Sequence, residues 1–369
     1  MELRSVELRL IRMPLRSPFR TSFGEEGTKE AILIRVETND GGWGWGECAA
    51  SAEPRYSEDF NDAEWLVLFD HMIPGLLGAG AIGAEGVSGR LAWVRGHRMA
   101  KAALEMAVLD AELRAAERSL ADHLGAERDR VACGVSVGIA PSVDALLEQV
   151  SAFVERGYVR VKLKIEPGWD VQPVTAVRET FPDTPVSVDA NAAYRLADLS
   201  LFEALDVLDL MMIEQPLDHD DLVQHAALQG RIATPVCLDE SIRSAADARA
   251  AIGLGSCRVI NIKAGRVGGL LEAKRVHDVA REAGIPVWCG GMLETGVGRA
   301  ANLALAALPG FTLPGDTSAS DRYFEDDLTE PFVLDADGTI AVPKGPGLGV
   351  EPRPDRLDAV TVRVERVSA

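Results

Sequence analysis

Short apolar runs alternate with helical stretches over residues 131–315. Eight of these runs are typical of β-strands: CGVSVGI, YVRVKLKI, PVSVDAN, LDLMMIE, TPVCLDE, CRVINIK, IPVWCGG and FTLPGD. Eight strands with intervening helices in about 185 residues predict a compact parallel β/α barrel. An open doubly wound sheet is disfavoured, because the first run continues as CGVSVGIAPSVD, which is not the G-x-G-x-x-G phosphate loop of that fold.

The first third of the chain has a different pattern. Two strand-like segments, VELRLIRMPL and EAILIRVET, flank a predicted loop, SPFRTSFGEEG, and a third short strand follows the glycine-rich turn in GGWGWGEC. Residues 98–124 carry apolar positions at helical spacing and are dense in Ala, Leu, Glu and Arg, which predicts one long helix. We therefore expect an α+β domain over residues 1–125, the barrel over residues 126–318, and a C-terminal segment over residues 319–369 that packs back on the first domain.

Five charged residues end successive apolar runs at nearly constant spacing. Lys164, Asp189, Glu214, Asp239 and Lys263 are 25, 25, 25 and 24 residues apart. One strand, one helix and two short loops need about 25 residues, so each interval corresponds to one βα unit. A single charged residue at a strand end is usually a solvated loop residue. Five at the same phase indicate a common site at the carboxyl end of the barrel.

The three acidic members of this series lie on the third, fourth and fifth predicted strands, which are neighbours. Carboxylates this close repel one another unless a cation holds them together. An all-oxygen set without histidine favours a hard ion. Asp189, Glu214 and Asp239 therefore predict a site for Mg²⁺, with Mn²⁺ or another divalent cation as the alternative.

The two lysines of the series lie on the second and sixth predicted strands, on opposite walls of an eight-stranded ring. Lys162 precedes Lys164 by two residues and shares its strand face. We expect mutual repulsion and a nearby metal ion to lower lysine pKa values, so that one lysine acts as a base near neutral pH. These groups predict abstraction of a proton α to a carboxylate, because the resulting enediolate requires a metal ion and a cationic partner.

Other side chains are expected to support this chemistry. Asn191 and Asn261 lie two residues from a member of the series and are expected to orient its charged groups. Glu240 directly follows a member of the series and is expected to pair with a lysine. Phe19 and Phe23 precede the second predicted strand and serve either local packing or a lid.

Composition narrows the class of partner. The chain has 57 acidic and 38 basic residues, a net charge of -19, which disfavours nucleic acid and anionic membranes as partners. Its five widely spaced cysteines indicate buried thiols rather than disulfides or a zinc site. The N-terminal segment MELRSVELRLIRMPLRS alternates apolar with polar residues, so it is neither a signal peptide nor a membrane anchor, and we expect a cytoplasmic location.

Several of these segments resemble motifs of the enolase superfamily. VKLKI is similar to its K-x-K base motif, VDAN, IEQP and LDES to its three metal-ligand strands, and NIKAGRVGG to the second-base strand of its muconate-lactonising branch. The resemblance covers essentially the whole chain and implies an α/β fold, a modified (β/α)7β barrel with an α+β N-terminal capping domain. It also implies that SPFRTSFGEEG and residues 50–60 form a lid over the barrel, which favours substrate contact for Phe19 and Phe23.

The branch of the superfamily can be narrowed by the same resemblance. IPVWCGG has no histidine, which excludes the mandelate-racemase-like branch. Asp316 is followed by Thr317 and Ser318 rather than by the Asp-x-Asp of many dipeptide epimerases, which weakens that alternative. The segments most similar to o-succinylbenzoate synthases that also racemise N-acylamino acids are GHRMAKAALEMAVLDAELRA, CGVSVGI, IKAGRVGG, WCGGMLETGVGRAAN and LPGDTSASDR.

The resemblance implies a role for each candidate residue. Lys164 and Lys263 become the acid/base groups, Lys162 becomes the cation that stabilises the enolate, and Arg266 tunes Lys263 electrostatically. Asp189, Glu214 and Asp239 become the metal ligands. The residues expected to contact the substrate are Ser136, Gly291, Met292, Leu293, Phe19 and Phe23.

Two reactions follow from this resemblance: dehydration to o-succinylbenzoate in menaquinone synthesis, and racemisation of N-acylamino acids such as N-succinylamino acids. A muconate-type cycloisomerase and a dipeptide epimerase are alternatives on the same scaffold. A metal-free Schiff-base barrel lyase and a silent barrel scaffold are alternatives from other classes. We expect a small-molecule carboxylate as the partner and a homo-oligomeric assembly.

Overall fold

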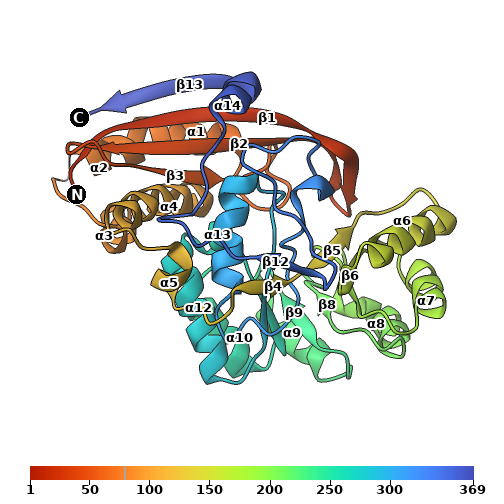
Figure 1. The fold of residues 1–369 in the computed structure, drawn as a ribbon. Helices are drawn as coiled ribbons and strands as arrows, with labels where there is room; N and C mark the ends of the chain where they lie inside the picture. Colours follow the sequence, from red (N-terminus) through yellow and green to blue (C-terminus); the bar gives the residue numbers. More distant parts are fainter. Residues whose placement is uncertain (79) are drawn as a thin grey trace.

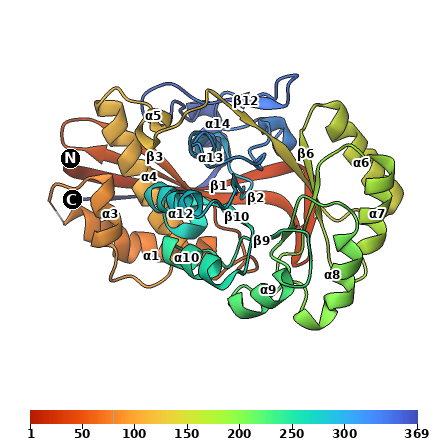
Figure 2. The same cartoon turned by 90° about the horizontal axis from the view of Figure 1, so that it is seen from below.

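The computed structural model describes residues 1–78 and 80–369, and Figures 1 and 2 show its arrangement. An antiparallel sheet at the top of Figure 1 lies over a parallel sheet that is surrounded by helices. The antiparallel sheet has the strand order β13-β1-β2-β3. Its strands are β1 (Leu3–Thr21), β2 (Gly24–Thr38), β3 (Trp43–Cys48) and β13 (Thr361–Ser368). Alternate residues of β1, among them Val6 and Leu8, are fully buried, as expected for a strand with one covered face.

The helices that follow β3 are α1 (Asn61–Val67), the π-helix η1 (Leu68–Met72), α2 (Ile73–Leu77), α3 (Ala84–Arg90), α4 (Arg98–Ala115) and α5 (Leu120–Leu124). Of these, α1, α2 and α4 contact the antiparallel sheet, whereas α3 and α5 pack on α4. Helix α4 packs directly on β3, where a Cβ atom at Gly46 would lie 2.1 Å from the carbonyl oxygen of Ala103. Glycine is therefore required for this close approach.

Two predictions for this part of the chain are wrong. The single helix expected over residues 98–124 is two helices, because residues 115–118 are all exposed and Glu117 adopts a left-handed backbone conformation. Ser119 then caps α5 by accepting a hydrogen bond from the Asp122 amide. The loop expected at SPFRTSFGEEG is largely strand, because the register shifts between Pro14 and Phe19 and pairing with β2 then resumes.

The parallel sheet contains seven strands in consecutive order. They are β5 (Gly134–Val137), β6 (Arg160–Lys164), β7 (Val186–Asp189), β8 (Ile213–Glu214), β9 (Val236–Leu238), β10 (Val259–Ile262) and β11 (Val287–Cys289). The connecting helices are α6 (Val143–Glu155), α7 (Val171–Thr180), the short 3₁₀-helix η2 (Leu196–Asp198), α8 (Leu199–Asp206), α9 (Leu222–Gln229), α10 (Ala245–Leu254), α11 (Ala264–Val267), α12 (Leu270–Glu282) and α13 (Gly296–Ala306). This arrangement confirms the predicted α/β barrel class with an N-terminal α+β region.

The eighth apolar run, FTLPGD, joins the two ends of the parallel sheet. Phe311 forms a parallel bridge with Val287 of β11, and Gly315 forms one with Cys133, next to β5. The run makes isolated bridges rather than a regular strand, in keeping with Pro314, which has no amide hydrogen to donate to a ladder. Seven units of a strand followed by a helix, from β5 to α13, precede this run in the described residues. The run supplies the eighth strand position, so the barrel is of the predicted (β/α)7β type.

The C-terminal part of the chain returns to the first sheet. After η3 (Ser320–Arg322), β12 (Thr339–Ala341) pairs with β4 (Arg130–Ala132), α14 (Pro354–Val360) follows, and β13 pairs antiparallel with β1. The exact domain boundaries at residues 125 and 318 stay a prediction. All five cysteines are free and buried, as predicted. Among the described residues, no helix has both the length and the apolar character needed to cross a membrane.

Candidate active site

The parallel register of the barrel brings the five evenly spaced residues to one end of the sheet. Lys164 of β6 lies beside Asp189 of β7, and Asp189 lies beside Glu214 of β8. Asp239 and Lys263 directly follow β9 and β10. All five side chains are buried, so they form one charged cluster inside the barrel mouth.

Lys164 is held by two oxygen atoms. Its Nζ donates to Asp189 Oδ2 at 2.6 Å and to Asn191 Oδ1 at 2.7 Å. The Asn191 amide in turn donates to Glu240 Oε1 at 3.0 Å. Glu240 therefore reaches Lys164 through Asn191 rather than directly, and its pairing with a lysine stays a prediction.

Lys263 lies on the other side of the cluster and shares a carboxylate with Arg266. Lys263 Nζ is 2.8 Å from Asp239 Oδ2, and Arg266 donates to the second oxygen of Asp239. Arg266 also donates to the carbonyl oxygen atoms of Ile242 and Asn261 at 2.8 and 2.6 Å, which fixes the guanidinium group. Lys263 also donates to the Tyr56 hydroxyl at 3.1 Å.

Lys162 lies deeper in the barrel among three carboxylates. Its Nζ is 2.7 Å from Asp316 Oδ2, 2.9 Å from Glu214 Oε2 and 3.2 Å from Asp189 Oδ2. Its ammonium group is also 4.7 Å from the centroid of the Trp288 ring. These contacts hold the Lys162 charge in place, while Asn261 donates to Glu214 Oε1 at 2.7 Å and orients that carboxylate.

The carboxylates dominate the ionisation of these lysines. Burial lowers the pKa of Lys162, but the carboxylates of Asp316, Glu214 and Asp189 raise it by more than burial lowers it. The pKa of Lys162 therefore lies above the usual value. Burial likewise lowers the pKa of Lys263, and Tyr56 and Glu240 more than compensate. With these partners both lysines favour the protonated form, and the lowered pKa expected of a lysine beside a bound cation stays a prediction.

Two acidic groups respond in opposite directions. Burial raises the pKa of Asp189, but Lys164 and Lys162 lower it by more than burial raises it. The pKa of Asp189 therefore lies well below the usual range. Burial and the Asp189 carboxylate raise the pKa of Glu240 to about 7. Asp189, which contacts both Lys164 and Lys162, therefore ionises more readily than Glu240 does.

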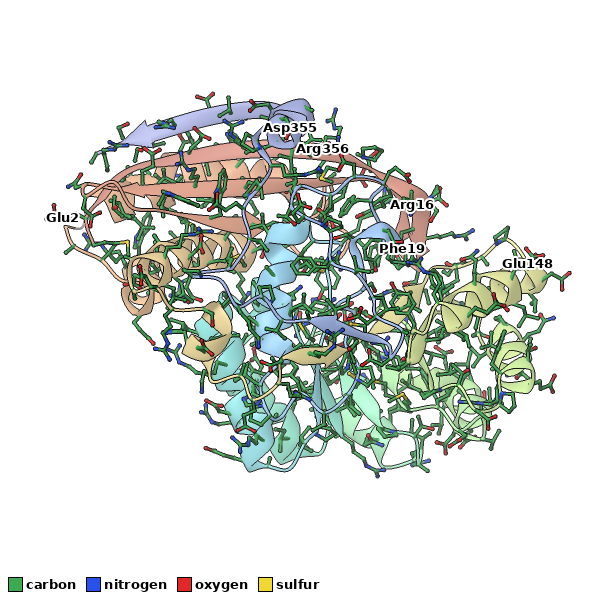
Figure 3. All side chains as sticks on the ribbon, viewed as in Figure 1. Glu2, Arg16, Phe19, Glu148, Asp355 and Arg356 are labelled. Atoms are coloured by element: carbon green, nitrogen blue, oxygen red, sulfur yellow. The ribbon has the colours of Figure 1, made fainter. Side chains whose placement is uncertain are left out.

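A cavity of about 350 Å³ opens above the two lysines. The β1–β2 hairpin forms one wall and contacts the barrel, since Ser22 donates to the Ala190 carbonyl oxygen at 3.2 Å. Figure 3 labels Phe19 near the end of this hairpin. The sequence-predicted residues that line the cavity are Phe19, Phe23, Lys164, Asn191, Lys263, Gly291, Met292 and Leu293. Ser136 is not among the lining residues: it lies beside Lys162 in the sheet, with a buried hydroxyl that has no hydrogen-bond partner.

Sequence reasoning missed two side chains that contact the lysines. Tyr56 lies within the predicted lid segment, residues 50–60, but no periodic pattern distinguishes it from its neighbours. Asp316 ends the eighth apolar run and therefore shares the position of the other acidic residues, although its contact with Lys162 was not expected. Asp316 is also 3.0 Å from Arg160.

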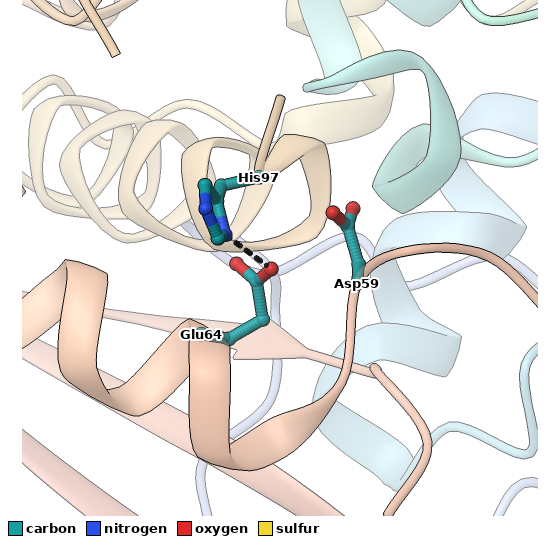
Figure 4. Close-up of side chains that lie close together, drawn as sticks. All are labelled: Asp59, Glu64 and His97. Atoms are coloured by element: carbon teal, nitrogen blue, oxygen red, sulfur yellow. Dashed lines mark hydrogen bonds and ion pairs between the residues drawn. The ribbon is translucent and has the colours of Figure 1, made fainter. Parts of the chain in front are cut away.

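A separate group of metal-ligating side chains lies in the N-terminal domain. Figure 4 shows Asp59, Glu64 and His97, whose ligand atoms lie within 4.8 Å of one another. Asp59 and Glu64 accept hydrogen bonds from the amides of Met99 and Ala100, so this group caps the first turn of α4. A second group within that distance, Asp218, His219 and Asp220, is exposed.

The predicted metal ligands are arranged differently. Among the described residues, Asp189, Glu214 and Asp239 are not grouped within that distance, and each is paired with a lysine ammonium group. Their donor set still suits a hard cation, because all three are buried carboxylates at the ends of neighbouring strands. Glu214 Oε2 forms an ion pair with Lys162 Nζ at 2.9 Å but accepts no hydrogen bond.

Comparison with known proteins connects this geometry to a family. Residues 4–125 match the mandelate racemase / muconate lactonizing enzyme N-terminal domain, and residues 145–356 match the enolase C-terminal domain-like family. The chain belongs to the enolase superfamily. It is an enzyme of this superfamily, whose members bind a divalent metal ion, and the predicted resemblance is confirmed.

Individual relatives cover nearly the full length of the chain. An N-succinylamino acid racemase of Amycolatopsis sp. is 59% identical over 98% of both chains. An o-succinylbenzoate synthase of Geobacillus kaustophilus is 51% identical over 94% of this chain and 92% of that protein. A solved enolase-superfamily structure from Listeria innocua has a TM-score of 0.95 and 41% identity, and it covers 100% of this chain and 99% of its own.

Proposed function

We propose that this enzyme removes the proton α to a carboxylate to give an enediolate, and that it acts as an N-succinylamino acid racemase, an o-succinylbenzoate synthase, or both. The observation that carries this proposal is the placement of Lys164 and Lys263. These lysines come from β6 and the end of β10, four strands apart in the sheet order, and both line the same cavity. A substrate between them presents its α-carbon to one amine on each face. The names of the full-length relatives support the same two reactions.

Lys164 and Lys263 are proposed to transfer the proton. For an N-succinylamino acid, one lysine takes the α-proton and the other returns a proton to the opposite face, which racemises the substrate. For a cyclohexadiene hydroxy acid, Lys164 takes the proton and hydroxide leaves, which gives the aromatic o-succinylbenzoate. Lys162 is proposed to stabilise the enediolate, because its ammonium group is fixed 3.2 Å from Asp189 and 2.9 Å from Glu214, two of the proposed metal ligands.

Asp189, Glu214 and Asp239 are proposed to hold the divalent cation, with Mg²⁺ as the expected ion. The cation supplies positive charge that stabilises the enediolate when it is bound. The buried site has five basic and five acidic side chains, whose formal charges cancel. These are Arg160, Lys162, Lys164, Lys263 and Arg266, with Asp189, Glu214, Asp239, Glu240 and Asp316. A divalent cation adds two positive charges, and the enediolate group adds two negative charges. Binding both therefore leaves the charge balance of the site unchanged.

The substrate contacts are assigned to the cavity lining. Phe19 and Phe23 of the hairpin, together with residues 291–293, surround the space above the lysines. They supply apolar contact for a side chain or acyl group. The contact expected for Ser136 gains no support, because Ser136 is not among the residues that line the described cavity.

Asp316 argues against the dipeptide-epimerase alternative. A dipeptide substrate carries an ammonium group that requires a free carboxylate. Asp316 is paired with Lys162 at 2.7 Å and Arg160 at 3.0 Å, so its charge is already compensated. Muconate-type cycloisomerisation is an alternative on the same scaffold, and ultraviolet measurement of cis,cis-muconate consumption tests it directly.

Deuterium exchange tests the proposal. Each enantiomer of N-succinylphenylalanine is incubated with the enzyme and Mg²⁺ in D₂O, and deuterium at the α-carbon is followed by NMR. The wild-type enzyme should exchange and interconvert both enantiomers. K164R and K263R should each abolish racemisation but retain exchange of opposite enantiomers.

Other outcomes separate the remaining reactions. Dehydration of the hydroxy acid without any α-deuteration would leave synthase activity alone. Activity that survives EDTA and disappears on borohydride trapping would support a Schiff base instead. Absence of both reactions in the wild-type enzyme would refute the proposed function.

A further inference from the structure

Glu47 of β3 connects the antiparallel sheet to the barrel. Its carboxylate accepts hydrogen bonds from the Thr295 amide at 3.0 Å, the Thr295 hydroxyl at 2.7 Å and the Gly298 amide at 2.8 Å. Thr295 is the N-cap residue of α13, and Gly298 lies in its first turn. A side chain of the N-terminal sheet therefore caps a barrel helix, where a negative charge is favourable.

The residues immediately before α13 form part of the active-site cavity. Residues 291–293 line it, and Leu293 adopts a left-handed backbone conformation with φ of 57°. This conformation is unfavourable for a non-glycine residue and persists only where neighbouring contacts impose it. The contacts within the segment are few: the Met292 amide donates to Glu294 Oε2 at 2.8 Å, and Arg299 donates to the Glu294 carbonyl oxygen at 2.9 Å.

Both ends of this segment are fixed. At its start, a Cβ atom at Gly290 would lie 2.7 Å from Cε of Lys263, so the chain passes directly against the catalytic lysine. At its end, Thr295 is held by Glu47 through both its amide and its hydroxyl. The segment is short, so a displacement of Thr295 is transmitted to the residues that line the cavity.

We infer that Glu47 is a positioning residue for residues 291–293, and that it thereby sets the affinity for substrate without contacting it. Glu47 is 4% exposed and is not among the residues that line the described cavity. Its effect on catalysis is therefore indirect. The kinetic effect rests on the proposed function, whereas the effect on the backbone of residues 291–293 does not.

Glu105 of α4 provides a matched control. It also comes from the N-terminal domain, is 2% exposed, and accepts a hydrogen bond from the Leu271 amide at 3.0 Å in the first turn of α12. Burial raises the pKa of both Glu47 and Glu105 to about 7. The described lining of the cavity includes no residue of α12, so E105Q removes the charge of a comparable cap without releasing a cavity wall.

The test compares E47Q and E105Q with the wild-type enzyme by steady-state kinetics, thermal unfolding and hydrogen exchange of peptides that cover residues 290–298. In E47Q, KM for N-succinylphenylalanine should rise about tenfold while kcat changes less than about threefold, as expected when binding rather than chemistry is impaired. Amide exchange in residues 291–293 should accelerate. In E105Q, KM and this exchange should stay at wild-type values even if the melting temperature falls as far as in E47Q.

Equal changes in E47Q and E105Q would overturn the positioning role, because they would show that loss of stability alone is responsible. Unchanged exchange of residues 291–293 in E47Q would overturn it as well. If the wild-type enzyme turns over neither substrate, the proposed function fails, and the exchange measurement still decides the role of Glu47. If E47Q does not fold, Thr295→Val removes one of the three hydrogen bonds and should produce the same shifts at smaller amplitude.

Discussion

In the E105Q variant, the free energy of unfolding should lose part of its dependence on pH. Glu105 lies between α4 and α12 and is almost fully buried, so its charged form is desolvated. The amides of Leu271 and Leu270 offset part of this cost. Burial dominates and raises the pKa of Glu105 from 4.5 to about 7. Glutamine keeps an oxygen acceptor for the Leu271 amide and cannot ionise.

The sign of the effect follows from linkage. The folded protein binds the Glu105 proton more tightly than the unfolded chain does, so this group contributes its full stability below pH 4.5. That contribution decreases as the pH rises and levels off above about 7. At about 1.4 kcal/mol per pH unit, the interval from 4.5 to about 7 corresponds to about 3 kcal/mol. The stability of E105Q relative to wild type should therefore increase by about 3 kcal/mol between pH 4.5 and pH 8.

Urea unfolding of both proteins between pH 4.5 and 8 measures this difference. Taking the difference cancels the titration of every other group that the two proteins share. A difference that stays constant over this range would show that Glu105 has an ordinary pKa. A difference that moves in favour of wild type as the pH rises would show that the α12 N-terminus stabilises the carboxylate by more than burial destabilises it.

Three further predictions concern the site and the packing around it. Y56F removes the hydroxyl that contacts Lys263 and should slow α-deuteration of the enantiomer that depends on Lys263 about tenfold more than that of the other, measured by NMR in D₂O; equal slowing of both would contradict it. G46A places a Cβ atom 2.1 Å from the Ala103 carbonyl oxygen and should destabilise the protein by about 1–3 kcal/mol in urea unfolding, whereas G253A, which has open space around its Cβ, should be neutral or slightly stabilising. EDTA should abolish turnover and added Mg²⁺ should restore it, and turnover that persists after chelation would refute the assignment of a divalent cation.

The barrel and the charged cluster could be predicted because both depend on local geometry. The length of a βα unit sets the interval between Lys164, Asp189 and Glu214, and parallel register then places them side by side. The alternation of apolar runs along the chain contains all of this information. It does not contain the ion pairs, so the three carboxylates that outweigh burial and raise the pKa of Lys162 could not be predicted.

The contacts of Tyr56 could not be predicted in the same way. Its hydroxyl contacts a lysine 207 residues further along the chain, and no repeat relates the two positions.

The break in the helix after Ala115 has a local cause that the composition of this segment, rich in helix-forming residues, does not reveal. Four successive exposed residues remove the apolar face that would keep the chain helical, and Ser119 offers a new cap.

Two of the contacts between the N-terminal domain and the barrel act on chemically different parts of the site. Tyr56 contacts Lys263, one of the two lysines proposed to transfer the proton, whereas Glu47 holds the start of α13 next to the cavity wall. Changes near Tyr56 should therefore alter the rate at one face of the substrate, and changes at Glu47 should alter affinity at both faces. The same domain can thus adjust substrate choice while Lys164, Lys162 and their carboxylates stay in place, which is consistent with one scaffold serving both a racemase and a synthase.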